Sequence, residues 1–374
     1  MSKVQKKFLA NFEKSLHELE DWFERQKRVL PWREEPTLYR VWISEIMLQQ
    51  TQVITVIPYF ERFIGRFPTV GKLAQASEED VMTHWAGLGY YSRARNLHRG
   101  AKMIVEAGGF PKTRDTWLEI PGVGPYTAGA VVSIALDHPE PILDGNVERV
   151  LSRVHRVGAG GAKENVKEKL WKLSQVFVST AHENKIKPSV LNQALMELGA
   201  TVCTPKNPKC SACPLTGICR ARATDEIELY PAKKKKKEWI AVKEQVHCFV
   251  NDEGKVLLEK RKEGQWRSGL WDLPEEVPFS SRQTGKKVGL IQTQHIVTRH
   301  KITRETSVYR LEKKRGLQAA ESLGILSGEK VWRWESLEKL LGSNGTRPAI
   351  AVGSALKRTL SRVLARFPEA VPER

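Results

Sequence analysis

The stretch CTPKNPKCSACPLTGIC at residues 203–219 holds four of the five cysteines in this 374-residue chain. The four are spaced Cys-x6-Cys-x2-Cys-x5-Cys, and three prolines stiffen the loop that carries them. Thiols inside a cell stay reduced or bind metal instead of pairing as disulfides. The loop therefore predicts a metal site, occupied by zinc or an iron-sulfur cluster, with four ligands: Cys203, Cys210, Cys213 and Cys219.

The overall composition is strongly basic. The formal net charge is +18 and 40% of the residues are hydrophobic, so the chain should fold and should bind a polyanion such as nucleic acid. Charge that only maintains solubility is the alternative. The longest apolar run, residues 128–136, is shorter than the ~20 residues of a membrane span, and the basic N-terminus lacks an apolar signal core. We expect a cytoplasmic protein with no membrane segment.

The length and the residue pattern indicate two domains. Apolar residues recur at helical spacing from about residue 9 to residue 198, which predicts an all-α region. A proline and a run of five lysines near residue 235 have nothing apolar to bury and read as a linker. The expected division is a helical domain at 1–225, a basic linker at 226–238 and a mixed α and β domain at 239–374.

Alternating residues predict the strands of the second domain. Residues 246–250 and 256–260 read as two strands joined by a short turn, and Cys248 in the first is expected to be a small core residue. Further strands are expected at 301–311 and 330–334, and the last amphipathic helix is expected at residues 351–367.

Residues 118–136, LEIPGVGPYTAGAVVSIAL, place two glycines in a tight turn before a helix rich in small residues. Gly122 and Gly124 can adopt positive φ and leave backbone N–H groups bare, and Pro125 suits a first helical position. A helix N-terminus of this kind binds phosphate without reading sequence. An ordinary helix-turn-helix in a core is the alternative.

Glu45 is the only charged residue or histidine in residues 41–60. A carboxyl group on a helix among apolar neighbours is desolvated, which favours its neutral form and suits a general acid at neutral pH. Alternatively, Glu45 reaches solvent or pairs with Arg33 or Arg40.

Asp144 directly precedes an apolar-periodic helix. The commonest role of an aspartate at such a position is to cap the helix N-terminus. Taken alone, the pattern around Asp144 favours the cap.

Five motifs together resemble the adenine DNA glycosylases of the MutY family, within the helix-hairpin-helix or endonuclease-three superfamily: LPWR (30–33), SEIMLQQTQV (44–53), GLGYYSRARNLH (87–98), PGVGPYTAGA (121–130) and LDGNVERVL (143–151). The cysteine spacing also resembles the [4Fe-4S] loop of that superfamily, and the likeness extends from about residue 22 to residue 219. It implies an all-α helix-hairpin-helix glycosylase domain with a [4Fe-4S] loop, followed by an α+β Nudix-like domain.

The resemblance also implies catalytic roles. Glu45 would protonate N7 of adenine, and Asp144 would stabilise the sugar cation left when the base departs. Tyr126 and Asn146 would position these groups and the attacking water. Bifunctional members of the superfamily have a lysine where this chain has Tyr126, so the chain resembles a monofunctional glycosylase.

The DNA contacts implied by the family fall into two groups. Arg28, Trp32 and Gln193 would lie at the adenine pocket, while residues that wedge into the base stack or touch the opposite base would be Gln50, Thr51, Leu88 and Tyr90. An apolar plug such as Leu88 makes chemical sense where a base is flipped out. Tyr90 could instead be a core aromatic. We predict that the arginines beside it form an edge facing DNA: Arg93, Arg95 and Arg99.

The C-terminal domain resembles the Nudix-like domain with which these glycosylases read 8-oxoguanine, most clearly at GLWDLPEE, residues 269–276. No Glu-rich box for Mg2+ is present, so a reader is expected and not a pyrophosphate hydrolase. The family's Phe-Ser-His loop corresponds to Thr298-Arg299-His300, which retains only the histidine. His300 is the candidate contact to the damaged base, and the departure predicts weaker discrimination between guanine and its oxidised form.

The sequence thus predicts a monofunctional adenine glycosylase with a [4Fe-4S] cluster. It would act as a monomer in the cytoplasm, at the nucleoid, on double-stranded DNA with adenine opposite 8-oxoguanine or guanine. Three alternatives remain: a bifunctional glycosylase-lyase, a non-enzymatic iron-sulfur DNA-binding module, and a nucleotide hydrolase. Tyr126 disfavours the first, and the missing metal box disfavours the last.

Overall fold

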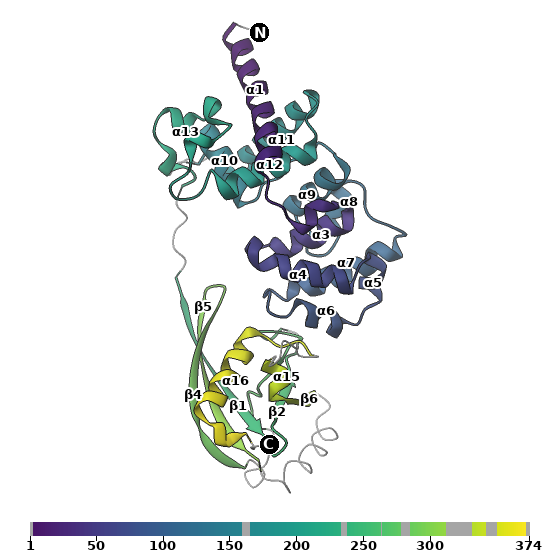
Figure 1. The fold of residues 1–374 in the computed structure, drawn as a ribbon, viewed down its shortest axis with the longest axis vertical. Coiled ribbons are helices and arrows are strands. Elements are labelled where there is room, and N and C mark those ends of the chain that lie inside the picture. The colour runs from purple at the N-terminus through teal and green to yellow at the C-terminus, as the bar shows by residue number, and fades with distance from the viewer. Residues whose placement is uncertain are drawn as a thin grey trace. The chain divides into compact units, whose positions relative to one another are not determined.

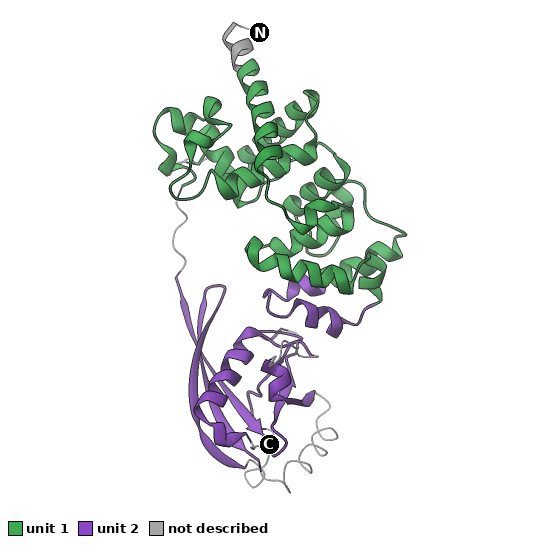
Figure 2. Ribbon diagram, in the orientation of Figure 1, with its two compact units in different colours: residues 1–75, 96–235 green, residues 76–95, 236–374 purple. Residues whose placement is uncertain are grey.

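The structure is a computed structural model that describes residues 3–158, 165–232, 238–262, 264–277, 285–311, 331–341 and 350–371, with backbone only for 3–8. The chain divides into two compact units (Figure 2). The first combines residues 1–75 with 96–235, and the second combines 76–95 with 236–374. None of the described helices is both long and apolar enough to cross a membrane.

The first unit is helical throughout its described residues, as the apolar spacing predicts (Figure 1). Its helices are α1 (Lys3–Gln26), α2 (Pro31–Glu34), α3 (Leu38–Leu48), α4 (Val53–Arg66), α5 (Val70–Gln75), α7 (Ser92–Glu106), α8 (Arg114–Leu118), α9 (Pro125–Leu136), α10 (Gly145–His155), α11 (Val166–Glu183), α12 (Pro188–Thr201) and α13 (Arg220–Ala223). Three short 3-10 turns complete it: η1 (Cys210–Ala212), η2 (Thr216–Ile218) and η3 (Ile227–Leu229). The unit boundary falls within α7, whose first residues belong to the second unit.

Helix α9 lies at the centre of the first unit. Its residues are apolar or small almost all round, so the helix can be buried on every side, and it packs against α3, α8 and α12. Gly129 allows the closest approach, because a Cβ there would lie 2.2 Å from the carbonyl oxygen of Pro141. Beside it, the fully buried rings of Trp42 and Trp117 lie 5.7 Å apart. The pair of rings joins α3 to α8, and both of these helices pack against α9.

The turn before α9 follows the predicted hairpin at one glycine and departs from it at the other. Gly122 has φ of +80°, and a Cβ there would approach Asn96 to 3.0 Å. Gly124 does not use positive φ; it is the extended N-cap of α9, with φ of −103° and no side-chain cap, and Pro125 takes the first turn. The first backbone N–H groups of α9 therefore have no capping side chain.

The second unit contains a sheet of six described strands with order β3-β2-β1-β5-β4, and β6 paired to β2. The strands are β1 (Ile240–Val250), β2 (Lys255–Lys260), β3 (Trp271–Asp272), β4 (Lys286–Val297), β5 (His300–Arg310) and β6 (Trp332–Ser336). β1 runs parallel to β5, and the other pairs are antiparallel. Helices in this unit are α6 (Glu78–Trp85), α15 (Leu337–Leu341) and α16 (Ser354–Arg366), followed by η5 (Pro368–Ala370).

The elements expected in the C-terminal region are confirmed where the structure describes them. β1 is longer than the pattern predicted, and β3 and β4 were not predicted. Cys248 is fully buried in the core that β1 and β2 share with α16, as predicted. The lysine run at 233–237 lies outside the described residues. Residues 76–95 join this unit through side chains, since Trp271 donates to Glu79 at 3.1 Å and Arg95 donates to the carbonyl oxygen of Ser268 at 2.7 Å.

Candidate active site and cysteine loop

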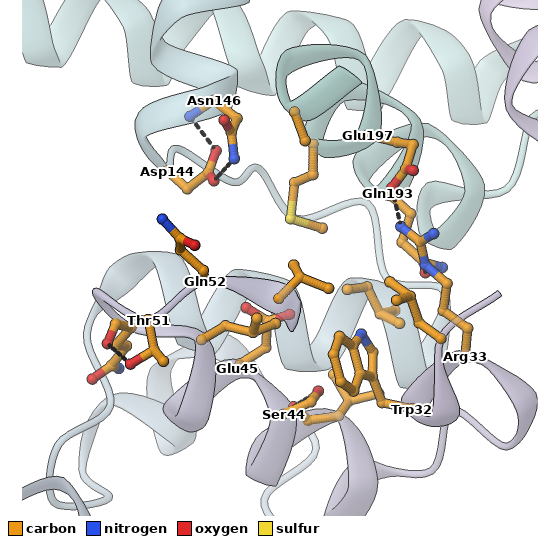
Figure 3. Close-up of a pocket in the computed structure, with 18 of the residues that line it drawn as sticks. Trp32, Arg33, Ser44, Glu45, Thr51, Gln52, Asp144, Asn146, Gln193 and Glu197 are labelled. Carbon is orange, nitrogen blue, oxygen red and sulfur yellow. Dashed lines mark hydrogen bonds and ion pairs between the residues drawn. The ribbon is translucent and has the colours of Figure 1, made fainter. Parts of the chain in front are cut away.

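A cavity of about 570 Å3 opens in the first unit (Figure 3). Its walls come from the segment before α2, from α3 and the turn after it, from the N-termini of α9 and α10, and from α12. These segments are distant in sequence. They meet around the cavity because α3 and α12 both pack against α9. All the predicted catalytic and adenine-pocket residues line this one cavity: Arg28, Trp32, Glu45, Tyr126, Asp144, Asn146 and Gln193. Two of the residues predicted to wedge into the base stack or touch the opposite base, Gln50 and Thr51, line it as well.

Glu45 lies on α3, and only 5% of its surface is exposed. Burial raises the pKa of this carboxyl to about 7; a hydrogen bond from Tyr126 and the charge of Arg33 oppose the rise, and the charge of Asp144 adds to it. The burial predicted from the apolar window is confirmed. The alternative of a solvated Glu45 is wrong. A carboxyl that is protonated in a large fraction of molecules at neutral pH can act as a proton donor.

Tyr126, in the first turn of α9, is the direct partner of Glu45. Its hydroxyl donates to Oε2 of Glu45 at 2.7 Å and lies 3.2 Å from the sulfur of Met196. Burial raises the pKa of Tyr126 well above its ordinary value, so the hydroxyl stays protonated and remains a donor. It therefore stabilises the ionised form of Glu45.

Asp144 is the N-cap of α10. Its Oδ1 accepts from the backbone N–H groups of Asn146 at 3.0 Å and Val147 at 2.7 Å, and its Oδ2 accepts from the Asn146 side chain at 3.0 Å. The predicted cap is confirmed, and the same carboxylate lines the cavity. Burial raises the pKa of Asp144, while these donors and the charge of Arg149 oppose the rise. Figure 3 shows Asp144 and Asn146 on one side of the cavity and Glu45 on the other.

The start of α10 is held against α12 by a glycine. A Cβ on Gly199 would lie 2.6 Å from Cβ of Asn146 and 2.9 Å from its carbonyl oxygen, so only glycine fits without displacing that backbone. Arg149 reinforces the contact, because its Nη2 donates to the carbonyl oxygen of Gly199 at 2.6 Å and to Oδ1 of Asn146 at 2.9 Å. The position of Asp144 thus depends on this helix contact.

An ionic cluster around the buried Glu197 forms another part of the cavity wall. Glu197 on α12 is 1% exposed and accepts from Arg28 at 2.5 Å and from Arg33 at 2.9 Å. Arg33 also donates from Nε to Oε1 of Gln193 at 3.1 Å, while Gln193 donates to the carbonyl oxygen of Ser189 at 3.1 Å. These bonds fix which end of the Gln193 amide faces each neighbour.

The sequence motifs do not identify Arg33 or Glu197 as site residues, although a signal for Glu197 exists. It is the only charged residue in residues 188–202, and it lies one helical turn after Gln193. The reasoning applied to Glu45, a single carboxylate in an apolar helix, would have found it.

Leu88 and Tyr90 do not line this cavity. Leu88 is buried, whereas Tyr90 is 41% exposed with φ of +48°, a conformation that is costly for a bulky residue and is commonest at functional sites. Arg93, predicted on a DNA-facing edge, is only 8% exposed instead. Its guanidinium lies over the rings of Trp85 and Tyr90 and donates to the carbonyl oxygen of Gly89. These contacts stabilise the loop that carries Tyr90.

The Thr298-Arg299-His300 segment is the turn of the β4–β5 hairpin. Val297 and His300 pair across it, and Thr298 has φ of +53°, as tight two-residue hairpin turns require. Thr298 and Arg299 are exposed. His300 begins β5, pairs with Ile240 of β1, and packs edge-on against Trp266 with ring centroids 5.0 Å apart.

The four loop cysteines line one small cavity beside α10 and α12. Among the described residues, no group of three or more His, Cys, Asp or Glu is arranged to hold a single metal ion. The thiols instead surround a volume, which suits a cluster that presents a separate iron to each ligand. Burial raises the pKa of Cys213 to about 12, so a thiolate there needs a metal to stabilise it. Arg153 donates to the sulfur of Cys203 at 3.3 Å, a contact that would stabilise a negative thiolate.

Comparison with known proteins agrees with this donor set. Residues 203–219 match the iron-sulfur binding domain of endonuclease III, and residues 43–175 match the HhH-GPD superfamily of base excision DNA repair proteins. The family match and the cysteine-rich loop together show that the chain carries a [4Fe-4S] cluster. A solved thermostable thymine-DNA glycosylase, 24% identical, shares the fold with a TM-score of 0.51 over 59% of this chain and 100% of its own.

The relatives with curated names agree among themselves. The chain is 48% identical over 218 residues to the human adenine DNA glycosylase, covering 55% of this chain but 39% of the human protein. It therefore spans about two fifths of that relative's length. It is 40% identical over 250 residues to the adenine DNA glycosylase of Buchnera aphidicola subsp. Schizaphis graminum, covering 66% of this chain and 70% of the relative. With identity and coverage at this level, the chain belongs to the adenine DNA glycosylase family.

Proposed function

We propose that the protein is a monofunctional adenine DNA glycosylase of base excision repair. The observation that carries the proposal is one cavity between two carboxyl groups that have different hydrogen-bond partners. Glu45 has a pKa of about 7, and Asp144 is held by three N–H donors. A cavity of about 570 Å3 is large enough for a flipped purine nucleoside.

In the proposed reaction Glu45 donates its proton to N7 of the flipped adenine, which makes the neutral base a leaving group. The bond between the base nitrogen and C1′ of the sugar then breaks, and its electron pair leaves with adenine. Asp144 faces the resulting oxocarbenium ion with its negative charge. Water then adds to C1′ and loses a proton to the Glu45 carboxylate, which restores the acid. Asn146 and Tyr126 hold the two carboxyl groups in place through the hydrogen bonds given above.

Hydrolysis by water, and not attack by an amine, is supported by the lining of the cavity. Among the residues that the structure describes, no lysine lines it, and Tyr126 occupies the position of the lysine in bifunctional relatives. A Schiff base with the sugar therefore has no nucleophile here.

Several surfaces support binding of duplex DNA by a single copy of the chain. The uncapped N-terminus of α9, after Gly122 and Gly124, offers N–H groups to a phosphate. Tyr90, exposed on a strained loop beside Leu88, suits a wedge that enters the base stack. Gln50, also at positive φ, and Thr51 lie at the cavity mouth, where they would contact the opposite base. The excess positive charge adds affinity that does not depend on sequence.

We further propose that the C-terminal α+β domain is Nudix-like and reads 8-oxoguanine opposite the adenine. The division into a helical domain at 1–225, a linker at 226–238 and a reader at 239–374 belongs to this proposal. The exposed turn at Thr298 and Arg299 is suitable for a groove contact, and His300 is the candidate contact to the base. The [4Fe-4S] cluster would hold its basic loop against phosphates, which is a structural role. A chain that repairs chromosomal DNA would work at the nucleoid.

The test is release of adenine from duplexes that carry it opposite 8-oxoguanine, guanine or thymine, each analysed with and without hot alkali. We expect strand cleavage only after alkali, and only for the first two duplexes. Cleavage without alkali would indicate a lyase. No base release from any duplex, with binding retained, would favour the non-enzymatic DNA-binding module.

A further inference from the structure

Glu197 is an unusual carboxylate for a cavity wall, because it is 1% exposed and yet remains ionised. Burial alone would raise its pKa, but hydrogen bonds and charges from Arg28 and Arg33 lower the pKa below its ordinary value. Arg28 contacts both carboxylate oxygens, at 2.5 and 3.0 Å, and Arg33 contacts Oε2 at 2.9 Å. Glu197 is buried and the Arg33 side chain is only 15% exposed, whereas the Arg28 side chain is 40% exposed. Burying an ion pair is costly, so the pair of Glu197 and Arg33 is weak evidence for added stability and invites another explanation.

Arg33 is the member of this cluster that acts on the proton donor. Its side chain is 15% exposed, it lines the same cavity as Glu45, and its positive charge favours the ionised form of that carboxyl. A partly buried cation whose charge is offset by an adjacent anion has a weaker field at a third group than the cation alone. Glu197 provides that anion.

The groups that face Glu45 can be named element by element. Arg33 of α2, Tyr126 of α9 and Asp144 at the start of α10 influence its ionisation directly. Arg28, before α2, also lines the cavity, and Glu197 is the charged residue that α12 contributes. On α3 itself Glu45 is the only charged side chain in the cavity lining. The balance at Glu45 thus depends on one cation near it and on the anion that pairs with this cation.

We propose that Glu197 is a positioning residue that holds Arg33 and masks its charge, so that Glu45 remains a proton donor at neutral pH. The inference rests on the proposed function for its catalytic consequence. Its electrostatic part concerns the ionisation of Glu45 alone and can be measured without catalysis. Glu197 itself donates no proton and touches no reacting atom; it acts only through Arg33.

The test compares wild type with Glu197→Gln and Glu197→Asp in single-turnover release of adenine across pH 5–9. Glutamine keeps the shape and one acceptor but loses the charge, so the pH at which the rate falls by half should drop by about one unit. The loss should be about tenfold at pH 8 and small at pH 5. Aspartate keeps the charge and should hold the midpoint near that of wild type. A rate lowered equally at every pH, or an unchanged profile, would overturn the proposal.

A charge-balanced comparison covers the case in which Glu197→Gln does not fold. Arg33→Gln alone removes the cation and leaves Glu197 in place, so the midpoint should rise. The double variant with Glu197→Gln should lie lower than Arg33→Gln, because the anion is then lost as well. Coincident midpoints would mean that Glu197 exerts no charge effect on Glu45, which contradicts the inference.

Titration of Glu45 by 13C NMR separates this inference from the proposed function. The protein is labelled at the glutamate carboxyl carbons, and the Glu45 resonance is assigned by its absence in Glu45→Gln. If wild type releases no adenine, the proposed function fails, but the titration midpoint in Glu197→Gln still decides the inference. A midpoint about one unit below wild type supports it, and an equal midpoint rejects it.

Discussion

Replacing Glu45 by glutamine should abolish adenine release and, at alkaline pH, make the protein more stable. The folded protein holds the Glu45 pKa at about 7 against an ordinary value of 4.5. Between these values the folded chain retains a proton that the unfolded chain releases. The free energy of unfolding of wild type therefore falls as pH rises through this window.

The size of the effect follows from the shift. Two and a half pKa units, at about 1.4 kcal/mol each, correspond to roughly 3 kcal/mol of stability lost by wild type above pH ~7. Glutamine has no carboxyl proton to lose and can still accept the hydrogen bond from Tyr126. The advantage of Glu45→Gln over wild type should therefore grow by roughly 3 kcal/mol between pH 4.5 and pH 8.5.

The assay is urea unfolding of both proteins at pH 4.5 and pH 8.5, with the folded fraction read by pulse proteolysis. Comparison at two pH values removes any difference in packing between the two side chains, because packing does not titrate. An equal difference in unfolding free energy at both pH values would show that Glu45 ionises normally. The argument that its burial makes it a general acid would then be refuted.

Four further outcomes are expected. Tyr126→Phe removes the 2.7 Å donor to the Glu45 carboxylate, so the pH at which adenine release falls by half should rise by about one unit, measured by single-turnover kinetics; an unchanged midpoint contradicts this. Asp144→Asn keeps a good helix cap and should unfold within ~0.5 kcal/mol of wild type, but adenine release should fall at least ~100-fold; near-normal turnover would reject its role. Cys213→Ser should lower the iron content per chain, measured by a colorimetric iron assay, and full iron content would remove it from the ligand set. Asp272 forms ion pairs with Arg267 and Arg304, so Asp272→Asn should lower the free energy of unfolding by roughly 3 kcal/mol, measured in urea at pH 7. Because the two arginines hold the pKa of Asp272 below its ordinary range, the stability difference between wild type and variant should shrink as pH falls below ~4. A difference that stays constant with pH would refute this prediction.

Local patterns predicted the helical first region, four of the six described strands, the burial of Glu45 and the cap at Asp144, but not β3 or β4. The apolar window around Glu45 predicts burial, and the position of Asp144 before a periodic helix predicts a cap, because both depend on neighbours within one turn. The four cysteines of the loop also lie within 17 residues, so their spacing alone predicts a shared metal site. Such features are local, and a single sequence contains them.

The ionic cluster needed tertiary structure. Arg28 and Arg33 meet Glu197 across more than 160 residues of chain, and no local pattern connects them. Arg93 departs from its prediction for a related reason: helical spacing gives the face of α7 but not whether that face meets solvent or the loop before it. The grouping of residues 76–95 with the C-terminal unit likewise has no signal in composition or periodicity.

The glycine at position 199 has a consequence for inherited variation in this gene. A single added methyl group there would push the first turn of α10 away from α12, and the cap residue Asp144 would move with it. Such an allele would encode a chain with every reactive group intact and its helices still formed. Under the proposed function, that chain would lose adenine release as though a catalytic residue had been removed. Loss of function caused by a substitution at position 199 could therefore be mistaken for unfolding. Measuring the position of Asp144 in the variant would distinguish the two causes.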